Sequence, residues 1–109
     1  MLMKRYGSVI AVVPEKLEEY KKLHSAVWTS VLKTIKKCNI QNYSIYYKDG
    51  YLFSYYEYIG NDYEDDMAKM AADPETKRWW TLCKPCQIPL NTRQPDEWWA
   101  SMEEVFHLD

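Results

Sequence analysis

The spacing of apolar residues changes from strand-like to helix-like near Pro14. Residues 5–13 alternate in the way typical of a strand. Pro14 ends this strand and is compatible with the first turn of a helix. From Glu15 to about Lys37, apolar side chains return every three or four positions, so the pattern predicts one long amphipathic helix.

Two aromatic-rich runs follow, with a short polar turn between them. Residues 40–47 and 51–58 are dense in aromatic and β-branched side chains, which favour strands. They are joined through Asp49 and Gly50, and Asp-Gly is a strong signal for a hairpin. Both strands carry apolar residues on both faces, so a second apolar face has to be buried. We therefore expect a homodimer that packs sheet against sheet.

Turn and capping residues divide the second half of the chain. Residues 60–62 (Gly-Asn-Asp) end the hairpin and begin a second helix. Asp73 and Pro74 restart that helix, because Asp is a good N-cap and Pro a good first helical residue. Residues 101–107 read as a final strand. Three prolines mark an irregular loop before it: Pro85, Pro89 and Pro95.

The resulting order is βαββαβ, which predicts an α+β fold of the ferredoxin-like, split βαβ type. The 109 residues fit one compact domain, residues 1–109, and no repeat or linker divides them.

Composition and charge narrow the classes of partner. The formal net charge is −2, and acidic and basic residues are interspersed. We therefore expect no basic surface that would bind the phosphates of a nucleic acid. No apolar run approaches the roughly 18 to 20 residues of a membrane span. The N-terminus lacks the features of a secretion signal, and we expect a cytoplasmic protein. The 10 Tyr and 5 Trp suit either a ring-binding pocket or a packed dimer interface.

The chain contains three cysteines, Cys38, Cys83 and Cys86. An odd number without a secretion signal argues against a disulfide framework. Cys83 and Cys86 form a C-x-x-C motif, but it follows a helix rather than a strand, which disfavours redox chemistry. No spacing supplies the four ligands of a zinc site. We expect two local thiols here, and neither a metal nor a cofactor in the protein.

His24 is the strongest candidate for chemistry. Tyr20, His24 and Trp28 are spaced four residues apart, which places them on one face of a helix, among the apolar residues. An imidazole in that place can move protons near neutral pH. It can equally be a core histidine with one satisfied hydrogen bond, and position alone leaves both interpretations open.

Three further aromatic residues could converge with Tyr20 and His24 between the helices and the sheet. Tyr43 lies on the second strand, and Trp79 and Trp80 lie on the second helical region. Adjacent residues differ by about 100° around a helix. We therefore expect one Trp to line a pocket while the other packs.

Glu103 and Glu104 would point to opposite faces of the final strand. The one that faced inward would need a partner, such as a buried His or a sugar hydroxyl. The plain alternative is a solvated sheet edge.

Four motifs together resemble the L-rhamnose mutarotase family, in order and across essentially the whole chain. They are Glu19-Tyr20-x-x-x-His24-x-x-x-Trp28, Asn42-Tyr43-Ser44-Ile45-Tyr46, Arg78-Trp79-Trp80 and Glu104-Val105-Phe106-His107-Leu108. The resemblance implies ferredoxin-like subunits that pair into a dimeric α/β barrel.

The resemblance also implies an activity and a site. Such proteins interconvert the α and β anomers of L-rhamnose without metal or cofactor, and related proteins act on L-fucose, another 6-deoxy sugar. His24 aligns with the proton donor of the family. Tyr20, Tyr43, Trp79 and Trp80 align with its substrate-binding positions. The second proton carrier is either Tyr20, one helical turn from His24, or an acid.

The chain departs from the family pattern in two places. Thr29 and Ser30 follow Trp28, where the family usually has Pro-Glu, and residues 83–99 resemble one branch of the family and are longer than in others. Two alternative functions stand beside the mutarotase. One is a dimeric-barrel monooxygenase or haem-binding protein, by analogy of fold. The other is a non-catalytic sugar-binding domain.

Overall fold

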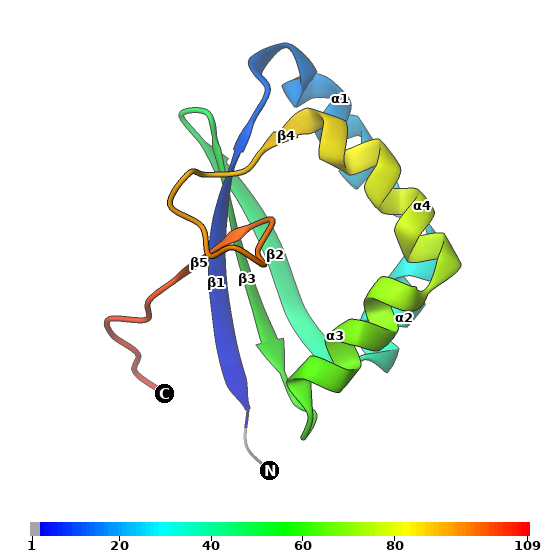
Figure 1. The fold of residues 1–109 in the computed structure, drawn as a ribbon, viewed down its shortest axis with the longest axis vertical. Helices are drawn as coiled ribbons and strands as arrows, with labels where there is room; N and C mark the ends of the chain where they lie inside the picture. Colours follow the sequence, from blue (N-terminus) through cyan, green and yellow to red (C-terminus); the bar gives the residue numbers. More distant parts are fainter. Residues whose placement is uncertain (1–2) are drawn as a thin grey trace.

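One antiparallel sheet carries all the helices of the protein on a single face (Figure 1). A computed structural model describes residues 3–109. β1 lies inside the sheet, with β3 and then β2 on one side and both β4 and β5 on the other. The strands are β1 Lys4–Val12, β2 Ile40–Lys48, β3 Tyr51–Tyr58, β4 Gln87–Ile88 and β5 Ala100–Met102.

The predicted α+β, ferredoxin-like order is confirmed, but each of its two helical connections is divided into two helices. α1 and α2 connect β1 to β2, and α3 and α4 follow β3. The helices are α1 Leu17–His24, α2 Thr29–Lys37, α3 Tyr63–Ala72 and α4 Pro74–Cys83, with short 3-10 turns η1 Pro14–Lys16 and η2 Lys84–Cys86. Among the described residues, no helix is long and apolar enough to cross a membrane.

The expectation of one helix from Glu15 to Lys37 is wrong, because the chain leaves helical geometry after His24. The backbone N–H of Ala26 bonds to the carbonyl of Leu23, and the Ser25 hydroxyl donates to the Lys22 carbonyl at 2.6 Å. These local bonds compete with continuation of the helix. Trp28 is extended (φ −58°, ψ 135°) and begins α2. It therefore does not share a helix face with Tyr20 and His24.

The predicted hairpin turn and the predicted cap at Asp73 are confirmed, and Asp62 provides a further cap that was not predicted. Asp49 and Gly50 have φ angles of 50° and 88°, which fits the left-handed turn that Asp-Gly favours between paired strands. Asp62 caps α3 by accepting from the backbone N–H of Asp65, and Asp73 caps α4 by accepting from the N–H of Thr76.

The last strand of the fold is divided into two pieces. β4 pairs with residues 11–12 of β1, and β5 pairs with residues 7–9. The loop 89–99 joins them. The expected strand over residues 101–107 is therefore wrong beyond Met102.

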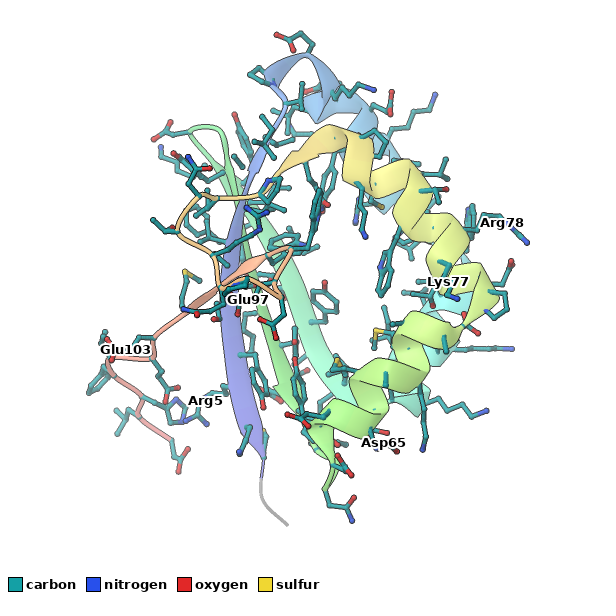
Figure 2. The ribbon with its side chains drawn as sticks, viewed as in Figure 1. Arg5, Asp65, Lys77, Arg78, Glu97 and Glu103 are labelled. Carbon is teal, nitrogen blue, oxygen red and sulfur yellow. The ribbon has the colours of Figure 1, made fainter. Side chains whose placement is uncertain are left out.

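The chain turns away where continued pairing would point Glu103 and Glu104 to opposite faces, one of them inward without a partner. Glu104 instead accepts from Arg5 at 2.8 Å on the exposed surface. The segment leaves on the side of the sheet opposite the helices, where Figure 2 labels Arg5 and Glu103. Three apolar residues in it are exposed: Val105, Phe106 and Leu108.

The strand register gives the sheet an inner and an outer face. Ile10 pairs with Leu52, and both are buried against the helices. Their neighbours Ala11 and Ile88, which pair with each other, face outward. The outer face carries exposed apolar side chains, among them Tyr46, Tyr51, Ile88 and Met102.

Candidate active site

A cavity of about 810 Å³ lies between the inner face of the sheet and the helices. All five residues proposed from the sequence line it: Tyr20, His24, Tyr43, Trp79 and Trp80. None of the described residues that line it is acidic. The cavity is walled mainly by aromatic and aliphatic side chains with a few hydroxyl and amide groups, and Lys36 and Lys84 also line it. A largely apolar wall with a few polar groups suits a ring-shaped ligand.

His24 is the last residue of α1, and its two ring nitrogens have different surroundings. Nδ1 lies 2.9 Å from the backbone carbonyl oxygen of Tyr20. A carbonyl only accepts hydrogen bonds, so Nδ1 carries a proton. Nε2 has no hydrogen-bond partner among the described residues. Burial lowers the pKa of His24 below its usual value of about 6.5, so the imidazole is neutral at pH 7 and Nε2 presents a lone pair.

Aromatic contacts hold the imidazole in place. The Tyr20 ring stacks on it with a centroid distance of 4.1 Å, and the Trp79 ring meets it edge-on at 5.5 Å. Tyr20 is itself buried, and its hydroxyl accepts a hydrogen bond from Gln87 Nε2 at 3.3 Å. Burial raises the pKa of Tyr20, which keeps the phenol protonated.

A β-bulge places Tyr43 in the cavity. The register of β2 shifts between Gln41 and Ser44, so two residues of β2 lie opposite one residue of β3. Asn42 adopts a positive φ of 49°, and its side chain donates to Glu57 at 2.6 Å. The Tyr43 ring lies 5.3 Å from that of Tyr56, which also lines the cavity. Desolvation there raises the pKa of Tyr43 to about 12.

Both members of the Trp79–Trp80 pair line the cavity, and Trp79 packs in the core as well. The cavity extends along α4 and around part of its surface. Two adjacent side chains that point in different directions from the helix can therefore both reach it. Trp79 is buried and also contacts Trp28 at 5.2 Å. Trp80 is half-buried, with the Lys84 ammonium 5.7 Å from its ring.

Several cavity residues were not anticipated from the sequence. Ser8 and Ser54 pair across β1 and β3 with their hydroxyls 2.5 Å apart. Gln87 in β4 accepts a hydrogen bond at 2.8 Å from the indole N–H of Trp98 in the loop 89–99. The Trp98-Trp99 pair was a visible signal, because adjacent Trp residues are costly to expose. Nothing in the pattern around Gln87 distinguishes it.

The remaining sequence candidates lie outside this chemistry. Burial raises the pKa of Cys83 to about 12 and also raises that of Cys86, which disfavours the thiolate that redox chemistry needs. Among residues 3–109, no group of His, Cys, Asp and Glu is arranged to hold a metal ion. Glu103 and Glu104 lie on the exposed tail, away from His24.

Known proteins match the chain over nearly its whole length. The family model for L-rhamnose mutarotase matches residues 5–108. An L-rhamnose mutarotase of Oceanobacillus iheyensis is 33% identical over 98% of this chain and 100% of its own length. One of Bacillus subtilis is 32% identical over the same shares. The crystal structure of an L-rhamnose mutarotase from Formosa agariphila shares the fold, with a TM-score of 0.73, 21% identity and coverage of 97% of this chain and 99% of that one. The chain therefore belongs to the L-rhamnose mutarotase family.

Proposed function

We propose that this protein interconverts the α and β anomers of L-rhamnose, or of a related 6-deoxy sugar such as L-fucose, and that His24 moves the proton. The observation that carries the proposal is the Nδ1–H bond of His24 to the Tyr20 carbonyl, which leaves Nε2 unpaired beside the cavity. The comparisons favour this function over a monooxygenase, a haem protein or a non-catalytic sugar-binding domain.

Mutarotation opens a pyranose and closes it again on the other face of the carbonyl. Nε2 of the neutral imidazole accepts the proton of the anomeric hydroxyl while the bond between C1 and the ring oxygen breaks. The imidazolium then donates that proton to the former ring oxygen. One imidazole can serve both oxygens, because both are bonded to C1 in the closed ring and so lie close together when the ring opens. After rotation about C1–C2, the same transfers run in reverse.

His24 thus accepts a proton before it donates one, which extends the donor role that the family resemblance implied. Tyr20 supports the step as a hydrogen-bond donor, since its raised pKa disfavours full loss of its proton. Acid–base catalysis of this kind contributes about 10²–10⁴-fold, which is enough for a reaction that also proceeds without catalyst.

The aromatic walls suit the apolar parts of a deoxy sugar. We assign Tyr43, Trp79 and Trp80 to substrate binding, with Tyr20 and His24 at the reacting atoms. Indole and phenol rings can stack on the C–H face of the pyranose and on its C6 methyl group. No metal or cofactor takes part in the proposed reaction.

We also propose that the protein forms a homodimer through the outer face of the sheet. The exposed apolar residues of that face and of the tail are numerous. Single apolar residues scattered over a surface need no explanation, but a group of this size indicates a surface that binds a partner. The cytoplasmic location and the lack of a nucleic-acid partner remain predictions.

Anomer exchange, measured by NMR saturation transfer over a panel of sugars, tests the function. The wild-type protein should accelerate exchange most for 6-deoxy sugars. His24→Ala should fold and bind sugar but lose about 10²-fold or more of the enzymatic rate. His107→Ala is the matched control, because His107 lies on the exposed tail and, within residues 3–109, its side chain bonds to Asp109 alone. A nearly normal rate of anomer exchange in folded His24→Ala would contradict the proposed mechanism.

A further inference from the structure

We propose that Gln87, oriented by Trp98, is a positioning residue that directs the hydroxyl proton of Tyr20 into the cavity. The inference rests on the proposed function and concerns how the same site recognises the reacting oxygens. It assigns a role to β4 and to the loop 89–99, which lie outside the four motifs that carry the family resemblance.

The chemistry of an indole fixes the orientation of the Gln87 amide. Trp98 Nε1 is only a donor, and it lies 2.8 Å from Gln87 Oε1. The oxygen of the amide must therefore face Trp98, and the NH₂ group must face the other way. That group lies 3.3 Å from the hydroxyl oxygen of Tyr20. Gln87 consequently donates to Tyr20 and offers it no acceptor.

The phenolic proton of Tyr20 has to point elsewhere. The Tyr20 hydroxyl makes no other hydrogen bond within residues 3–109, and Tyr20 lines the cavity. The proton is therefore available to a ligand.

The Tyr20 ring lies against His24, whose Nε2 presents a lone pair. The site thus offers one donor and one acceptor side by side. A cyclic hemiacetal needs this pair, since its ring oxygen accepts and its anomeric hydroxyl donates.

The loop 89–99 controls this orientation from outside the helix that carries Tyr20. The Lys84 ammonium lies 5.2 Å from the Trp98 ring and 5.7 Å from the Trp80 ring, so it joins the loop to the end of α4. If Trp98 could not donate, the Gln87 amide could turn over. Tyr20 would then donate to Gln87 Oε1, and the ring oxygen of the sugar would lose its donor.

Gln87→Glu tests the inference with little change of shape. An ionised Glu accepts from both Trp98 and Tyr20, so it draws the phenolic proton away from the cavity. We expect kcat for anomer exchange to fall about 10-fold or more, with a smaller change in KM. A protonated Glu instead donates to Tyr20 and accepts from Trp98, as Gln does. The ratio of the variant rate to the wild-type rate should therefore rise as the pH falls.

The matched control is Gln94→Glu, the same change on the exposed part of the loop, and its rate relative to wild type should not depend on pH. Trp98→Phe keeps an aromatic ring, removes the fixed donor and should also lower kcat; it replaces Gln87→Glu if that variant does not fold. A wild-type kcat in the folded variants, or a loss that stays constant with pH, would overturn the role of Gln87. Absence of exchange in the wild-type protein would instead refute the proposed function.

Neutron diffraction from crystals grown of the wild-type protein would provide a readout that does not depend on activity. A deuterium on the Tyr20 oxygen that points into the cavity would support the assignment. One that points at Gln87 would refute it.

Discussion

At the scale of single residues, His24 combines the two interpretations that its sequence position left open. Nδ1 makes the one satisfied hydrogen bond expected of a core histidine, to the Tyr20 carbonyl. That same bond fixes the tautomer and leaves Nε2 with a lone pair. The structural bond is therefore the reason that the ring is prepared to accept a proton.

The lowered pKa of His24 predicts how activity and stability depend on pH. The enzymatic exchange rate should be constant near pH 7 and fall on acidification, with its midpoint below about 6.5. The unfolded chain takes up the proton first, so the free energy of unfolding should also decrease as the pH falls from about 6.5 toward the native pKa. Exchange rates and denaturant titrations from about pH 8 to about pH 5 measure both slopes. His24→Gln should remove the stability slope, and an unchanged slope would contradict the assignment.

The two neighbouring Trp residues should respond differently to truncation. Trp80→Ala should weaken sugar binding by about 1–2 kcal/mol, because Trp80 is half-buried and supplies a ring face to the cavity. Trp79→Ala should in addition destabilise the fold by about 3–5 kcal/mol, because Trp79 is buried in the core. Calorimetric titration with sugar and thermal unfolding separate the two effects. If folded Trp80→Ala binds sugar as tightly as the wild-type protein, Trp80 only packs against its neighbours and does not bind the sugar.

The residue types of the site could be predicted from the sequence, but their hydrogen bonds could not. The spacing of Tyr20 and His24 correctly placed them together, because they are one turn apart on a helix that does form. The positions of Gln87 and Trp98 depend on how the end of the chain returns to β1, and no local pattern encodes that return.

At the scale of elements, the correct predictions were those that depend on interactions between residues close in sequence. Asp73 acts within the first turn of its own helix, so the prediction of this cap needed no tertiary information. The end of α1 after His24 and the bulge at Asn42 depend on alternatives to regular hydrogen bonding, and periodicity alone does not reveal these. The bulge is what places Tyr43 in the cavity.

The cap of α4 should contribute measurably to stability. The Asp73 carboxylate accepts from both the backbone N–H and the hydroxyl of Thr76, each at 2.9 Å. Asp73→Ala should therefore lower the free energy of unfolding by about 1 kcal/mol. Asp96→Ala, on an exposed part of the loop, is the control and should leave it unchanged. Denaturant titration measures both variants, and equal effects would mean that the cap contributes nothing specific.

At the scale of the whole molecule, the two faces of the sheet have different roles. The inner face forms one wall of the cavity, and the outer face carries exposed apolar residues. Arg78 on α4 points away from the cavity (Figure 2), whereas Lys36 on α2 and Lys84 at the end of α4 line it. The sequence could predict both apolar faces from alternation. It could not predict that the final strand would be divided, because the two short strands are fixed only by their pairing with β1.

Association through the outer face can be tested with a pair of matched substitutions. Ile88→Glu places a charge on that face, and Leu82→Glu places one on α4; the two wild-type residues are 47% and 40% exposed. Burying an unpaired carboxylate in an interface is costly. We expect Ile88→Glu to dissociate the dimer and Leu82→Glu to leave it intact, as measured by analytical ultracentrifugation at micromolar concentration. A monomeric wild-type protein would contradict the dimer.

The divided final strand has an evolutionary consequence. β4 and β5 each pair with β1 on their own, so the loop between them can lengthen, shorten or change sequence without altering the register of the sheet. That loop also carries Trp98, which reaches the interior. Changes in this loop can thus alter one part of the cavity wall while the strands and helices that hold His24 keep their arrangement.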